Sequence, residues 1–245
     1  MWIRKISAAD LATLGNGMSG FFGILYTLDR NFLAASLFIL CGGMLDGLDG
    51  YLARKFPPKH GAGRFLDSIS DTISFCFAPA FLLYQQFYSL ERGSAFVDFQ
   101  NFLAVLAPCL IAFLGLMRLV KFSLSGYKAP VFYGLPTPAT AMLAVSLSLL
   151  FGPVGVFREN YLAVLLPMCG FAFLMITDIE YPKARKGFYL WLSGIAGICI
   201  FFTLIGIKFQ IYWFALGNAL LSFFMLLLYT ISPLILIRRK KNGQG

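Results

Sequence analysis

Residues Phe32–Lys55 read FLAASLFILCGGMLDGLDGYLARK, and this stretch decides the fold class. Its first half is a continuous apolar run, whereas its second half places Asp46 and Asp49 among glycines, where a membrane helix ordinarily has leucine. A helix needs about 20 predominantly apolar residues to cross the hydrocarbon core of a bilayer. An ionised side chain inside such a helix is costly unless it faces a cavity or a partner, so both aspartates are candidate functional residues.

The rest of the chain has the composition of an integral membrane protein. Of its 245 residues 59% are hydrophobic and 13% are charged, whereas charged residues make up about a quarter of a soluble domain. Apolar stretches predict an all-α bundle of about eight transmembrane helices that forms one domain over residues 1–245. The helices are expected at Ala8–Leu28, Phe32–Lys55, from Gly63 onward, and at Phe102–Lys121, Ala139–Phe151, Leu162–Ile176, Phe188–Ile207 and Tyr212–Ile237.

The distribution of charge predicts the orientation of these helices. The net charge of +9 does not indicate a nucleic-acid partner, because sixteen of the twenty Lys and Arg residues fall in the termini and in alternate loops that share one side. The other side carries only Arg30, Arg92, Arg158 and Lys208. The positive-inside rule then places both termini in the cytoplasm, where the basic residues meet anionic lipid headgroups.

Two further aspartates complete a cluster at one end of the bundle. Asp46 and Asp49 are three residues apart and Asp67 and Asp71 are four apart, so each pair lies on one face of its helix. The two helices are antiparallel neighbours, which brings all four carboxylates to the cytoplasmic end. Four like charges repel one another in a pocket of low dielectric constant unless cations are bound. Oxygen ligands favour Mg²⁺ or Mn²⁺, and two ions bridged by shared carboxylates promote phosphoryl-type displacement.

Residues beside the aspartates fit a phosphate ligand. Gly47 and Gly50 leave room for a bulky group to approach the helix, and Arg54, one turn beyond Gly50, is placed to bind phosphate. Asp46 and Asp49 alone would also be compatible with a buried helix pair or a helix cap. Asp10 and Asp178, at the ends of apolar segments, are expected to be solvated.

With its spacing, this aspartate array resembles the signature of the CDP-alcohol phosphatidyltransferase family. The matching run is Asp46-Gly47-Leu48-Asp49-Gly50-Tyr51-Leu52-Ala53-Arg54, then eight residues, Gly63, three residues, Asp67, three residues and Asp71. Weaker similarities point to the membrane-type phosphatidylserine synthases within the family. They lie at Phe132–Ala139 (FYGLPTPA), Ile179–Lys183 (IEYPK) and Thr13–Asn16 (TLGN).

The resemblance implies a role for each matching residue. Asp46, Asp49 and Asp67 would hold a pair of Mg²⁺ or Mn²⁺ ions, with Asp46 and Asp67 bridging them. Asp71 would complete the coordination of the second ion and act as the catalytic base. The remaining residues that the resemblance assigns to the CDP-lipid are Gly50, Ala53, Arg54, Asn16, Thr13 and His60, the last of which is equally compatible with a plain loop position.

The implied reaction transfers the phosphatidyl group of CDP-diacylglycerol, or of an archaeal analogue, to L-serine and releases CMP at the cytoplasmic face. Arg118, Lys121 and Lys128 are candidates for binding the serine carboxylate, although each also fits the charge asymmetry alone. Glycerol phosphate, inositol phosphate or choline as the acceptor stays open, as do the lipid chains and the choice between the two metals. A cation-coupled transporter is a remote alternative, and the resemblance further implies a homodimer.

Overall fold

The computed structural model describes residues 7–55, 63–95, 98–125, 132–157, 160–181 and 188–241, and nearly all of them are helical. The elements are α1 (Ala8–Leu28), α2 (Phe32–Lys55), α3 (Gly63–Asp71), the π-helical η2 (Thr72–Phe77), α4 (Ala78–Phe87), the short 3₁₀ helix η3 (Leu90–Arg92), α5 (Phe99–Ser125), β1 (Phe132–Tyr133), α6 (Thr137–Phe151), α7 (Tyr161–Ile176), β2 (Glu180–Tyr181), α8 (Phe188–Lys208) and α9 (Tyr212–Lys241).

The all-α prediction is confirmed, and α3, η2 and α4 form one continuous span in place of the third predicted helix. The observed helix bounds agree with the predicted ones to within a few residues, apart from a longer α5 and a longer α9. Two features were not predicted. One is the π-helical segment directly after Asp71, and the other is an antiparallel pairing in which Phe132 faces Tyr181 and Tyr133 faces Glu180.

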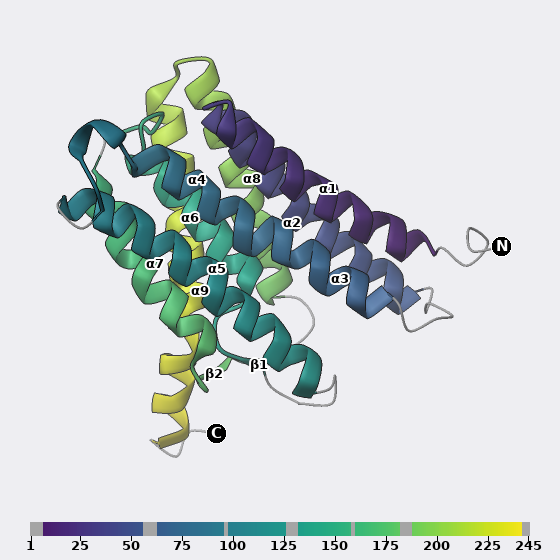
Figure 1. Ribbon diagram of the computed structural model, residues 1–245. Coiled ribbons are helices and arrows are strands. Elements are labelled where there is room, and N and C mark those ends of the chain that lie inside the picture. Colours follow the sequence, from purple (N-terminus) through teal and green to yellow (C-terminus); the bar gives the residue numbers. More distant parts are fainter. Residues whose placement is uncertain are drawn as a thin grey trace.

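The helices are arranged as two connected groups (Figure 1). The first group, purple to blue, packs α1 against α2 and against the α3–η2–α4 span. The second group packs α5 against α7 and α6 against α7, while the α8–α9 hairpin contacts α2 through α8 and α6 through both helices. Because α6 touches both groups, it forms the centre of the bundle.

Within the described residues, four helical spans are long and apolar enough to cross a bilayer: Phe32–Ala53, Phe65–Phe87, Phe99–Lys121 and Trp213–Ile231. Three shorter apolar helices cover Thr137–Phe151, Tyr161–Ile176 and Gly197–Lys208. Many large apolar side chains on the outside of the bundle are exposed, among them Phe113 and Phe224. An exposed apolar surface of this kind fits contact with lipid.

The first group is closely packed because α1 carries small residues where it meets α3 and η2. A Cβ atom added at Gly17 would lie 2.9 Å from Ser70 Oγ, and one added at Gly20 would overlap the backbone of Ser74. The Ser74 hydroxyl donates a hydrogen bond to the Asn16 carbonyl oxygen across this contact, at 2.7 Å. Small residues that permit such a backbone approach are typical of helix contacts in membranes.

We predict opposite effects for two Gly→Ala variants in the same fold. Gly20→Ala should destabilise the protein by about 1–3 kcal/mol, because the new methyl group forces α1 away from η2. Gly170→Ala should be neutral or stabilising, because Gly170 is an exposed helical residue with open space around it and alanine favours helix. Thermal unfolding of both variants in detergent measures the difference, and equal shifts would contradict the packing argument.

Candidate active site

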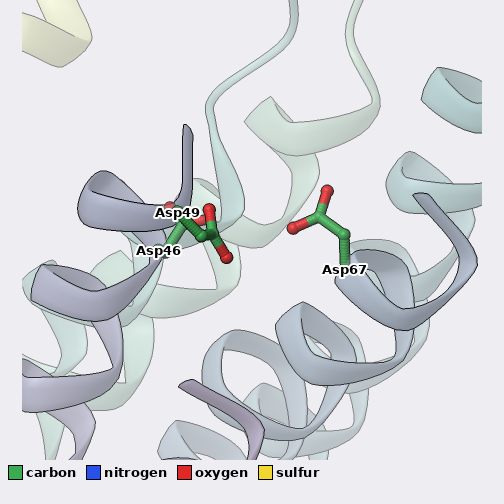
Figure 2. A group of neighbouring side chains, drawn as sticks. All are labelled: Asp46, Asp49 and Asp67. Carbon is green, nitrogen blue, oxygen red and sulfur yellow. The ribbon is translucent and has the colours of Figure 1, made fainter. Parts of the chain in front are cut away.

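Three carboxylates from two helices converge on one point (Figure 2). Asp46 and Asp49 project from α2 toward Asp67 on α3, and one oxygen of each lies within 4.8 Å of the others. Asp49 is buried, and Asp46 and Asp67 are half-buried. A ligand set made only of carboxylate oxygens fits a hard divalent cation, so these residues could hold one.

Asp71 lies one turn beyond Asp67 and joins the same cluster. It is half-buried, and it interacts electrostatically with Asp46 and with Asp67. The structure thus groups three of the four predicted carboxylates, and Asp71 is their neighbour on the same helix as Asp67. Four carboxylates in a largely apolar bundle repel one another strongly, so the cluster favours positive counter-charge.

Helix α1 supplies neutral hydrogen-bond donors to two of these carboxylates. Thr13 Oγ1 donates to Asp49 Oδ2 at 2.7 Å, and Asn16 Nδ2 donates to Asp71 Oδ1 at 3.0 Å. Both donors are buried, and they lie three residues apart on one face of the helix. Thr13 and Asn16 therefore help to fix the orientation of these two carboxylates.

The beginning of α1 is fixed next to the beginning of α3. Ser7 and Asp10 form a capping box, in which Asp10 Oδ2 accepts hydrogen bonds from the Ser7 amide and hydroxyl at 2.8 Å. A Cβ atom at Gly63 would lie 3.1 Å from Asp10 Oδ1, so the glycine of the signature allows α3 to start against this carboxylate. The expectation that Asp10 is solvated is wrong, because this packing leaves it only 6% exposed.

One side of the cluster is open. Apart from the adjacent residues and backbone of α2 itself, no described atom lies within 4 Å of the positions that Cβ atoms would occupy at Gly47 and Gly50. Ala53 follows on α2 and is half-buried. Arg54 lies in the last turn of α2, but its side chain is outside the described part of the chain, as is all of His60. The space that the sequence predicted beside the carboxylates is therefore present.

The three cations considered for the acceptor differ in their surroundings. Arg118 on α5 is buried, interacts electrostatically with Asp71, and donates from Nη1 to Thr137 Oγ1 at 3.4 Å. Lys121 is exposed and pairs with Asp178 at 2.6 Å, and that aspartate is solvated as expected. Lys128 lies outside the described residues.

Sequence reasoning missed Thr137, although it lies within the FYGLPTPA segment that was singled out by resemblance.

Comparisons with known proteins agree with this geometry. The family model for CDP-alcohol phosphatidyltransferase matches residues 6–179. The chain is 32% identical over 177 residues to CDP-diacylglycerol–serine O-phosphatidyltransferase of Bacillus subtilis, which covers 72% of this chain and 90% of that protein. It is 36% identical over 180 residues to archaetidylserine synthase of Methanothermobacter thermautotrophicus, and the match covers 73% of this chain and 70% of that protein.

A third relative covers more of the chain. The CDP-diacylglycerol–serine O-phosphatidyltransferase of Methanocaldococcus jannaschii is 33% identical over 199 residues, which are 81% of this chain and 85% of that protein. The region matched by the family model contains all four aspartates of the array, and three of them, Asp46, Asp49 and Asp67, lie together in the structure. The chain therefore belongs to the CDP-alcohol phosphatidyltransferase family of membrane-bound enzymes.

Proposed function

We propose that this enzyme transfers the phosphatidyl group of CDP-diacylglycerol, or the equivalent group of an archaeal CDP-activated lipid, to the hydroxyl of L-serine. The products are phosphatidylserine, or its archaeal counterpart, and CMP. The observation that carries the proposal is the convergence of Asp46, Asp49 and Asp67 beside the open face at Gly47 and Gly50. The choice of serine is supported by the names of the three relatives, because two are named for transfer to serine and the third is an archaetidylserine synthase.

The carboxylates fit a pair of divalent ions, Mg²⁺ or Mn²⁺. Asp46, Asp49 and Asp67 would hold the ions together with Asp71, and Asp46 and Asp67 would be shared between the two ions. Once bound, such ions would neutralise the carboxylates and stabilise negative charge on the phosphates of the substrate. Thr13 supports this arrangement because its hydroxyl keeps the Asp49 carboxylate in one orientation.

Asp71 is proposed as the base. The hydroxyl proton of serine passes to Asp71, the serine oxygen forms a bond to the lipid-bearing phosphorus, and the bond from that phosphorus to the CMP oxygen breaks. Asn16 donates a hydrogen bond to Asp71 Oδ1 and so helps to fix the orientation of this carboxylate. The residues proposed to line the CDP moiety are Gly50, Ala53, Arg54 and His60, with Thr13 and Asn16 as further neighbours.

For the acceptor, Arg118 is the strongest of the three cationic candidates, because it is buried beside Asp71. Lys121 already has a carboxylate partner, and it and Lys128 stay candidates by charge alone. The cytoplasm is the proposed location of the aspartate cluster and of both termini, since the basic residues gather at that end. A homodimer is also proposed, on the family resemblance.

The acceptor is tested with purified protein in detergent. We expect CMP release and a new lipid with L-serine when CDP-diacylglycerol or its archaeal analogue is supplied with Mg²⁺ or Mn²⁺. Glycerol 3-phosphate, inositol phosphate and choline should give no product. Transfer to one of these in place of serine would keep the chemistry and overturn the acceptor. The absence of CMP with every acceptor would count against the reaction itself.

Asp71→Asn should lower the turnover number by about 10²- to 10⁴-fold, because the base is lost. Binding of the CDP-lipid should be nearly unchanged, since the asparagine carbonyl can still accept the hydrogen bond from Asn16. Turnover and CDP-lipid affinity are measured side by side, with Asp29→Asn, an exposed aspartate at the far end of α1, as the matched control. Wild-type turnover in Asp71→Asn would remove this residue from the mechanism.

Asp46→Asn should weaken Mn²⁺ binding by at least about tenfold, because a neutral amide oxygen replaces a negatively charged carboxylate oxygen as a ligand of the ion. Titration of purified protein with Mn²⁺, followed by electron paramagnetic resonance, measures this change without requiring turnover. The control is again Asp29→Asn, which should bind Mn²⁺ like the unchanged protein. Equal affinity in Asp46→Asn and in the control would show that the cluster is not the metal site.

A further inference from the structure

Two of the three segments that resemble phosphatidylserine synthases in sequence, Phe132–Ala139 and the described part of Ile179–Lys183, lie together in space. β1 and β2 pair in antiparallel fashion, and the Gly134 amide donates to the Ile179 carbonyl at 3.0 Å. The Leu135 amide donates to the Leu174 carbonyl at 3.0 Å. Gly134 has a φ of +73°, and a Cβ atom there would overlap the Met175 carbonyl oxygen. This unit, Phe132–Pro136 with Glu180–Tyr181, fixes the start of α6 against the end of α7.

The N-terminus of α6 is left without a side-chain cap. Pro136 is the N-cap residue and makes no capping hydrogen bond through its side chain. Thr137 is the first helical residue, and its side chain contacts Arg118. The first amide groups of a helix lack partners within the helix, and the helix dipole places partial positive charge there. In α6 these are the amides of Thr137 and Ala139, because Pro138 has no N–H. An uncapped N-terminus beside a cation is suited to binding an anion.

Arg118 is a second, independent indication of an anionic ligand. It is 9% exposed, and among the described Lys and Arg side chains it alone is buried. Its Nε–H has no hydrogen-bond partner, and the contact of its Nη1 with Thr137, at 3.4 Å, is long for a hydrogen bond. A buried guanidinium with so few partners is costly, and an anion that accepts from its unused donors would remove much of that cost.

On the basis of the proposed function, we infer that Arg118 and the N-terminus of α6 form the subsite that binds the carboxylate of the acceptor serine. Arg118 is the residue that contacts the carboxylate. Thr137 is a positioning residue, because its hydroxyl holds the guanidinium at the end of the helix. Only two carbon atoms separate the hydroxyl of serine from its carboxylate carbon, so the subsite must lie near the base. α5 packs against η2, which follows Asp71 directly: a Cβ atom added at Gly115, one turn before Arg118, would lie 2.7 Å from Cys76 Sγ. Arg118 also interacts electrostatically with Asp71.

The charge of the subsite favours a carboxylate over a phosphate monoester. One guanidinium and a helix N-terminus, which is equivalent to roughly half an elementary charge, are partly offset by the neighbouring Asp71, so the subsite suits an anion with no more than one negative charge. A phosphate monoester carries close to two negative charges and would need a second cation. Among the described side chains, no other Lys or Arg is buried.

The test compares L-serine with ethanolamine, which keeps the hydroxyl and the amine but lacks the carboxylate. In Arg118→Gln, the KM for serine should rise about 100-fold, because the buried partner of the carboxylate is removed. The KM of ethanolamine as an acceptor, or its inhibition constant as a competitor, should not change. CDP-lipid affinity should also be retained. Arg92→Gln, which changes an exposed arginine in η3, is the matched control.

A second pair of variants tests the positioning role. Thr137→Val, which keeps the shape and removes the hydroxyl, should raise the KM for serine about tenfold, and Thr137→Ser should restore it. An unchanged serine KM in Arg118→Gln, or equal losses for serine and ethanolamine, would overturn the subsite and leave the proposed function in place. Transfer by the unchanged protein to glycerol 3-phosphate and not to serine would overturn the proposed function and, with it, the assignment to a carboxylate.

Discussion

Electrostatic repulsion among four carboxylates is the constraint on which the rest of the structure depends. Asp46, Asp49, Asp67 and Asp71 lie at one end of an otherwise apolar bundle, and each needs a partner that offsets its loss of water. Thr13 and Asn16 supply neutral donors to two of them. These short side chains reach the carboxylates only because α1 lies close to α3 and η2, and the glycines on α1 permit that approach. The apolar packing and the polar site are therefore consequences of one helix contact.

The π-helical segment after Asp71 belongs to the same arrangement. A π-helical turn contains more residues than an α-helical turn, so it changes the direction in which later side chains point. In this span, α3 presents carboxylates to the site, and α4 buries Leu82 and Leu83 in the core. Ser74, within the π-helical segment, donates its hydroxyl hydrogen to the backbone carbonyl of Asn16. The side-chain amide of Asn16 donates to Asp71. Such segments are frequent at functional sites, and here the segment begins at the residue that follows the proposed base.

Most helices and the aspartate cluster could be predicted from the sequence, because both depend on local spacing. The apolar runs fix the helix bounds, and intervals of three and four residues place each carboxylate pair on one face. The features that escaped prediction depend on distant partners. Asp10 is buried because Gly63 packs against it. Gly134, just before α6, donates its amide to the carbonyl of Ile179, just after α7. The burial of Arg118 likewise requires Thr137 from another helix. No spacing along the chain encodes these contacts.

The site has two halves, one proposed to bind the metals and phosphates and the other proposed to bind the acceptor alcohol. α1, α2 and α3 carry the carboxylates and the open face beside the glycines, and the requirements of metal and pyrophosphate chemistry determine their residues. α5 carries Arg118, which interacts electrostatically with Asp71 and contacts Thr137 at the start of α6. In the proposed subsite, this second half meets the carboxylate next to the hydroxyl of the alcohol, whereas the carboxylates of the first half act at phosphorus. If the subsite is correct, a change of acceptor calls for new residues on α5 and α6, while the reaction at phosphorus stays the same.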